Sequence, residues 1–75
     1  MTIAELRSLF ITTLLRRVGG THRRWRMVVS DVRVYSLETH LHCNWAVMPS
    51  GTIGENAAVE RLADELRLSH PIVTS

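Results

Sequence analysis

The stretches Thr2-Ile3-Ala4-Glu5 and Thr52-Ile53-Gly54-Glu55 carry the same pattern near the two ends of this 75-residue chain. Each matches a capping box, in which the threonine hydroxyl accepts from the backbone N–H three residues later and the glutamate reaches back to the threonine N–H. An apolar segment with helical spacing follows each box. We therefore expect one helix after each box.

The first helix is expected over Ile3–Arg17, and Gly19-Gly20 supplies the positive φ that ends it. Its main apolar stripe consists of Ile3, Leu6, Phe10 and Leu14. A second apolar line, Ile11, Leu15 and Val18, lies beside that stripe. A helix in so small a domain has one stripe to cover, so the second line predicts self-association through Ile11, Leu15 and Val18.

The middle of the chain, Arg23–Met48, alternates between apolar and polar residues with the period of a β-strand. Two-residue turns at Ser30-Asp31 and Glu38-Thr39 would place most of its large apolar side chains on one face of a three-stranded sheet. In this register Val34 lies opposite Cys43.

An alternative is a single long strand over residues 23–37 with a bulge at Ser30-Asp31. In either case a second helix follows over Ile53–Leu68, and His70-Pro71 ends it. The expected fold is α+β: a helix, a three-stranded antiparallel meander and a helix, with both helices on one face of the sheet. Residues 1–75 are expected to form one domain.

Hydrophobic residues make up 45% of the chain, which is typical of a packed core. The single cysteine, Cys43, cannot form an internal disulfide. Glu5 and Arg7 interrupt the N-terminal apolar run, unlike a secretory signal, and no apolar run approaches the ~18 residues of a membrane span. We therefore expect a cytoplasmic protein without a membrane partner.

All nine basic residues are arginines, and their distribution is asymmetric. Residues 1–37 hold seven arginines and two carboxylates, a net charge of +5, and residues 38–75 hold two arginines and five carboxylates, a net charge of −3. This asymmetry suits a homodimer or an anionic partner of the first half. The alternative is that the two halves neutralise each other within one fold.

Several short segments of the C-terminal half carry a resemblance. They are His42-Cys43-Asn44-Trp45, Pro49-Ser50-Gly51, Glu55-Asn56-Ala57-Ala58, Glu60-Arg61-Leu62 and His70-Pro71-Ile72-Val73. In these segments the chain resembles a family of short α-proteobacterial proteins to which no activity or site residue is assigned. The resemblance implies a bacterial, cytoplasmic source and transfers no functional residue.

The outer face of the expected meander is the strongest candidate for ligand binding. Its candidate residues are Arg24, Arg26, Arg33, Tyr35, His40, His42 and Asn44. Guanidinium and imidazole groups bind phosphate and carboxylate, so this face predicts nucleic-acid or anionic-ligand binding. The alternative is an ordinary solvated sheet face with polar cross-strand pairs.

His40 and His42 point to the same side of a strand, as metal-binding histidine pairs do, but a catalytic zinc needs a third protein ligand. The sequence contains neither a nucleophile elbow nor a glycine-rich phosphate loop. We expect no catalytic, cofactor-binding or metal-binding residues. The first expectation for function is therefore a small non-enzymatic interaction module that associates with itself or with an unidentified protein. Binding of nucleic acid or an anionic ligand through the Arg-rich face is the second.

Overall fold

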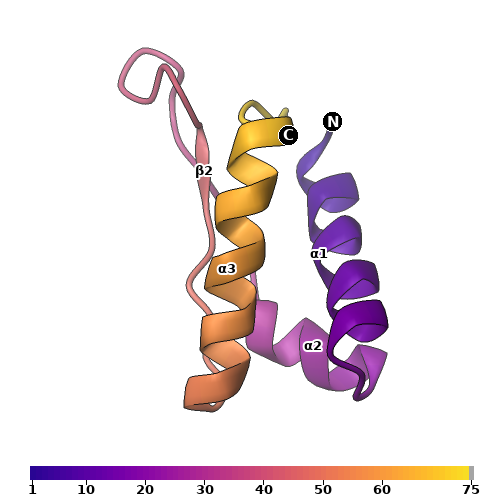
Figure 1. Cartoon of the computed structure of the whole chain (residues 1–75). Coiled ribbons are helices and arrows are strands. Elements are labelled where there is room, and N and C mark those ends of the chain that lie inside the picture. The colour runs from indigo at the N-terminus through magenta and orange to yellow at the C-terminus, as the bar shows by residue number, and fades with distance from the viewer. Residues whose placement is uncertain (75) are drawn as a thin grey trace.

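The computed structural model describes residues 1–74, and its elements follow one another in a simple order. They are α1 (Ile3–Arg17), α2 (His22–Val29), β1 (Arg33–Val34), β2 (Trp45–Ala46) and α3 (Ile53–Ser69). Figure 1 shows α1 and α3 side by side and running in opposite directions, with α2 crossing them at one end. The β1–β2 hairpin stands beside α3, and its loop projects at the other end, where both termini lie. The fold is α+β.

Both predicted capping boxes are confirmed. The Thr2 hydroxyl accepts from the N–H of Glu5 at 3.1 Å, and Glu5 accepts from the N–H of Thr2 at 3.0 Å. At the start of α3, Thr52 accepts from the N–H of Glu55 at 3.2 Å, and Glu55 accepts from the N–H of Thr52 at 2.8 Å. The two predicted helices therefore begin where the sequence places them.

The link between α1 and α2 depends on two glycines. Gly19 and Gly20 have φ values of +96° and +91°, in the region that favours glycine. The chain turns back closely enough for the Trp25 indole N–H to donate to the carbonyl of Gly19 at 2.7 Å. The hydroxyl of Thr21 then accepts from the N–H of Arg24 at 3.1 Å and caps α2.

The predicted first strand of the meander is wrong, because residues 22–29 form α2. Trp25, Val28 and Val29 are buried at helical spacing, whereas Met27 is 62% exposed. The apolar residues of this stretch fit the two-residue period of a strand as well as the 3.6-residue period of a helix. The stretch becomes a helix because one helical face is buried. The long bulged strand fails for the same reason.

The hairpin between the last two predicted strands is present, in a different register. β1 and β2 pair antiparallel, with Arg33 opposite Ala46 and Val34 opposite Trp45. The prediction placed Val34 opposite Cys43, two residues away. An even shift leaves each side chain on its original side of the strand, so Val34 and Trp45 still share a face. Val34 and Leu41, which the prediction placed on the apolar face, are nevertheless 39% and 73% exposed.

The loop between β1 and β2 causes the two-residue shift in register. Instead of a two-residue turn at Glu38-Thr39, the carbonyl of Ser36 accepts from the N–H groups of Thr39 and His40 at 3.2 and 2.9 Å. This single helical turn takes up more residues than the predicted turn does, so the paired strands are shorter.

The three helices contact one another instead of lying on one face of a sheet. Their buried side chains, together with β2 and the C-terminal segment, form one core: Leu6, Phe10, Ile11, Leu14, Trp25, Val28, Val29, Val32, Trp45, Val59, Leu62, Ala63, Leu66 and Val73. The Phe10 and Trp45 rings meet edge to face, with centroids 5.6 Å apart. The Trp45 indole N–H donates to the carbonyl of His70 at 2.8 Å, so its polar atom is satisfied inside the core.

A buried asparagine fastens the C-terminal segment. Asn44 is 4% exposed, its side-chain oxygen accepts from the N–H of Val73, and its amide donates to the carbonyl of Val73, both at 2.8 Å. Beyond it, the carbonyl of Thr74 accepts from the N–H of Ile3 at 2.9 Å. The last residues therefore join the hairpin to the beginning of α1.

We predict that Asn44→Ala destabilises the protein, because it leaves two buried backbone groups of Val73 unpaired. The expected loss is about 2–4 kcal/mol in the free energy of unfolding, since each unsatisfied group costs about 1–3 kcal/mol. Urea unfolding measures it. Asn44→Asp retains the acceptor for the N–H of Val73 but sets a buried carboxylate oxygen against the carbonyl of Val73, so it should also be destabilised. Hydrogen exchange should accelerate at the Val73 amide in the alanine variant. Equal stability of Asn44→Ala and wild type would contradict a structural role for Asn44.

Candidate functional site

The seven residues predicted to share one sheet face do not share it, because α2 replaces the first strand. Arg24 and Arg26 lie on α2, Arg33 lies on β1, Tyr35 follows it, His40 and His42 lie in the hairpin loop, and Asn44 is buried before β2. The predicted ligand face is therefore wrong as a single surface, and each part is described below from its own contacts.

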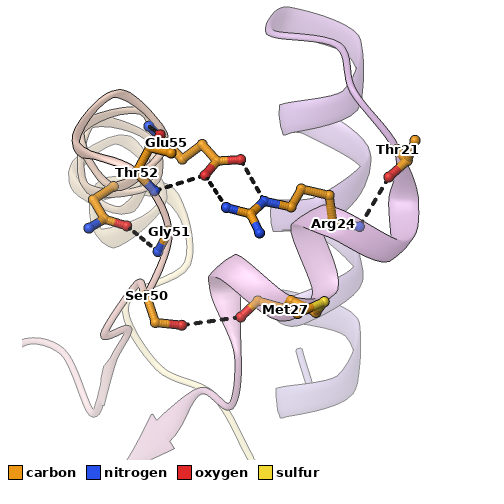
Figure 2. Close-up of polar contacts among 8 residues, drawn as sticks. Thr21, Arg24, Met27, Ser50, Gly51, Thr52 and Glu55 are labelled. Atoms are coloured by element: carbon orange, nitrogen blue, oxygen red, sulfur yellow. Dashed lines mark hydrogen bonds and ion pairs between the residues drawn. The ribbon is translucent and has the colours of Figure 1, made fainter.

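Arg24 is occupied by an ion pair between α2 and α3. Its Nε donates to Oε2 of Glu55 at 2.9 Å, and its Nη2 donates to Oε1 at 2.7 Å (Figure 2). The guanidinium and the carboxylate therefore form a bidentate pair with two parallel hydrogen bonds. The guanidinium of Arg24 and the backbone N–H of Thr52 lower the pKa of Glu55 from 4.5 to about 2. Arg24 is therefore a structural residue that holds α2 against the first turn of α3.

The segment just before α3, which contains Ser50 and Gly51, packs closely against α2 (Figure 2). Ser50 donates from its N–H to the carbonyl of Val28 at 3.0 Å and from its hydroxyl to the carbonyl of Met27 at 3.3 Å. A Cβ on Gly51 would lie 2.8 Å from a methyl of Val28 and 2.6 Å from Glu55. Only glycine fits between the two elements without displacing one of them.

The hairpin gathers exposed apolar and aromatic side chains. The Tyr35 ring stacks on His40, with centroids 4.3 Å apart and an interplanar angle of 17°. Nδ1 of His40 lies 2.9 Å from the hydroxyl of Thr39. Leu37 and Leu41 are both exposed, Leu41 by 73%. Among residues 1–74, no three His, Cys, Asp or Glu side chains are grouped to hold a metal ion.

The outer edge of β1 has unpaired backbone groups. The N–H of Tyr35 donates to the carbonyl of Asn44 at 2.7 Å, and the preceding pair is Val34 with Trp45. Antiparallel partners alternate between pairs that exchange hydrogen bonds and pairs that exchange none. Val34 is in a non-hydrogen-bonded pair, so its N–H and C=O point away from β2 toward the free edge. Its side chain is also exposed.

The second apolar line of α1 does not form one surface. Ile11 is 3% exposed and belongs to the core, and Leu15 is half-buried against it. Val18 is exposed at the end of α1, beside a hollow between α1 and α3. The α2 helix, absent from the sequence prediction, supplies a further apolar surface for α1 to pack against. Self-association through Ile11 would therefore require unfolding.

The sequence prediction missed a basic cluster between α1 and α2. Arg7 donates from Nε to the carbonyl of Ser30 at 2.7 Å and from Nη2 to the carbonyl of Arg26 at 3.1 Å. Arg7, Arg26 and His22 line one hollow, and Arg7, Arg26 and Arg23 line a second beside it. The signal was available: on a helix, position 26 neighbours positions 22 and 23 at i,i+4 and i,i+3 spacing.

Two ion pairs join the oppositely charged halves of the chain. Besides Arg24 with Glu55, Nη1 of Arg17 lies 2.6 Å from Oε2 of Glu65. Neutralisation between the halves therefore takes place within the fold, as one of the two expectations had it. It is partial, because Arg7, Arg23 and Arg26 contact no carboxylate within the part of the chain that the structure describes.

Comparisons of this chain with protein-family models, curated proteins and solved structures give no match. None of the helices in the described residues has the length and apolar character needed to cross a membrane. The arguments for function below therefore rest on the geometry of the hairpin edge and of the basic cluster.

We predict that the Arg24–Glu55 pair makes stability depend on acid pH. Because folding lowers the pKa of Glu55 from 4.5 to about 2, its contribution is fully present above pH 4.5 and is lost as pH falls toward 2. Urea unfolding at a series of pH values should show a smaller loss over this range for Glu55→Gln, which retains the capping pattern. Identical pH profiles for the two proteins would contradict the pairing.

Proposed function

We propose that this protein is a small non-enzymatic interaction module that pairs with a second copy of itself along the free edge of β1. The observation that carries the proposal is the outward-pointing N–H and C=O of Val34, exposed in an edge strand. Unpaired edges of this kind recruit a further strand, and natural monomers usually cover or block them.

A two-fold axis beside Val34 gives a register with complementary side chains. In this arrangement the two Val34 residues exchange both backbone hydrogen bonds, as in a hydrogen-bonded antiparallel pair. Arg33 of each copy then lies opposite Tyr35 of the other, where a guanidinium and an aromatic ring attract each other. The same register keeps the two Arg33 side chains apart, so their charges do not oppose the pairing.

The projecting loop adds apolar area at the rim. Leu37 and Leu41 are exposed on the loop that Figure 1 shows beyond the ends of the helices, so a second hairpin can approach without meeting the helices. The contact remains small, and interfaces of limited area are typically weak. We therefore expect a concentration-dependent dimer instead of an obligate one.

The contacts of three residues support a non-enzymatic role. Arg24 and Asn44, which the sequence made candidates for ligand binding, are committed to bonds that hold the fold together. The single cysteine, Cys43, is half-buried, with its Sγ 3.4 Å from the carbonyl of Trp45. The proposal includes the cytoplasmic, bacterial setting expected from the sequence.

We predict that Val34→Pro weakens the dimer by roughly tenfold or more and leaves the fold intact. Proline removes the N–H that points outward, and each dimer loses two backbone hydrogen bonds worth about 1 kcal/mol apiece. The bonds between β1 and β2 do not use that N–H, so the hairpin persists. Sedimentation equilibrium over a concentration series measures the dissociation constant, and circular dichroism checks the fold.

Two control variants distinguish pairing along the β1 edge from nonspecific apolar association. Val34→Thr keeps the N–H and the strand preference, and it should dimerise almost as wild type does. Ile53→Ser removes a 90% exposed apolar side chain at the start of α3 and should leave the dissociation constant unchanged. A wild-type protein that stays monomeric over the whole series would refute the proposal, as would equal dimerisation of Val34→Pro and Val34→Thr.

A further inference from the structure

The basic cluster between α1 and α2 has the form of a concave surface. Two adjoining hollows, with volumes of about 510 and 370 Å³, share Arg7 and Arg26. The first hollow is also lined by Thr2, Ser8 and His22 and by the apolar residues Ile3, Ala4 and Ile11. The second is lined by Arg7, Arg23, Arg26 and Met27. Among residues 1–74, no Asp or Glu side chain lines either hollow.

Arg7 is already fixed in position at the centre of this surface. Two of its five N–H donors bond to the carbonyls of Ser30 and Arg26, so the guanidinium is held against the end of α2. Its side chain is partly buried, which limits the rotamers available to it. An anion that binds the remaining donors therefore meets a group whose conformational entropy has already been lost.

Repulsion between the arginines of this cluster destabilises the protein when no ligand is bound. Arg23 and Arg26 are one helical turn apart, both are exposed, and both line the hollow that contains Arg7. Like charges at this spacing destabilise a helix. The first turn of α2 also contains no acidic residue. Elsewhere the fold compensates its arginines, as in the pairs of Arg17 with Glu65 and Arg24 with Glu55.

We infer that this surface binds the phosphate backbone of a nucleic-acid duplex, without preference for its sequence. Arginine forks match phosphate oxygens, and the guanidiniums of Arg7, Arg23 and Arg26 together carry more N–H donors than a single phosphate accepts. Trp25 is buried, so the imidazole of His22 is the aromatic ring that α2 offers at this surface, and the charged groups beside it are arginines. We choose the duplex over a single strand because its two backbones present twice as many phosphates per unit length to these arginines.

This inference does not rest on the proposed dimer. The residues that carry it lie on α1 and α2, whereas the dimer uses the edge of β1, and the two tests share no variant. Of the face predicted from the sequence, Arg26 alone takes part here, because Arg24 is engaged by Glu55.

The test is fluorescence anisotropy of a labelled duplex DNA of mixed sequence, titrated with the 75-residue protein at several salt concentrations. Contacts from three arginines predict a slope of about −2.7 in a plot of log association constant against log salt. Arg23→Ala with Arg26→Ala should weaken binding by roughly tenfold or more at low salt and reduce the slope by about 2. Arg23→Ala alone should give an intermediate result.

A matched control keeps the change in net charge the same. Arg17→Ala with Arg61→Ala also removes two positive charges, and both residues line the hollow between α1 and α3. This control should change affinity by no more than about twofold, because its arginines lie outside the site. Circular dichroism confirms that each variant is folded before its affinity is compared.

Other outcomes would overturn the inference. Equal weakening in the two double variants would show a response to net charge alone. Binding of inorganic phosphate, or of vesicles with anionic lipids, without binding of the duplex would show a different ligand for the cluster. Absence of duplex binding at low salt would refute the inference. Tighter binding of a single strand than of the duplex would contradict recognition of the duplex phosphate backbone.

Discussion

One carboxylate determines how α2 and α3 are placed. Glu55 accepts from the N–H of Thr52 and so completes the cap of α3, and the same carboxylate accepts from Nε and Nη2 of Arg24 in α2. Two helix starts that are far apart in the sequence are thereby fixed to one side chain. Gly51, which has no Cβ to separate the elements, allows the close approach that this requires. This contact, together with the burial of Trp25 and Val28, holds α2 across the ends of α1 and α3.

The parts of the fold that could be predicted are those with local causes. A capping box acts within four residues, and Gly19-Gly20 acts within the turn that it forms, so α1 and α3 follow directly from the sequence. The segment 22–29 could not be assigned in the same way, because its apolar residues satisfy the periods of a strand and of a helix. What decides is the packing of Trp25 and Val28 against α1 and α3, which is a non-local effect.

The candidate sites show the same limit. The excess of arginine in the first half was visible in the sequence, whereas the choice of partners was not: Arg24 meets Glu55, and Arg7 meets the last carbonyls of α2. Once α2 is known to be a helix, the face shared by positions 22, 23 and 26 becomes evident. The predicted meander placed Val34 on its central strand, and the free edge beside Val34 exists because α2 replaces the first strand. The two surfaces lie on different elements, so a pair of chains joined at β1 would carry two basic clusters.

The clasp between the two ends of the described chain has a consequence for biosynthesis. The N–H of Ile3 donates to the carbonyl of Thr74, and the buried amide of Asn44 donates to the carbonyl of Val73. A ribosome releases residues in order, so α1 can form early but cannot acquire its final neighbour until the last residues have emerged. Until then the Asn44 amide and the apolar surface under Val73 are uncovered. The nascent chain therefore passes through an open state whose lifetime is set by the rate of translation.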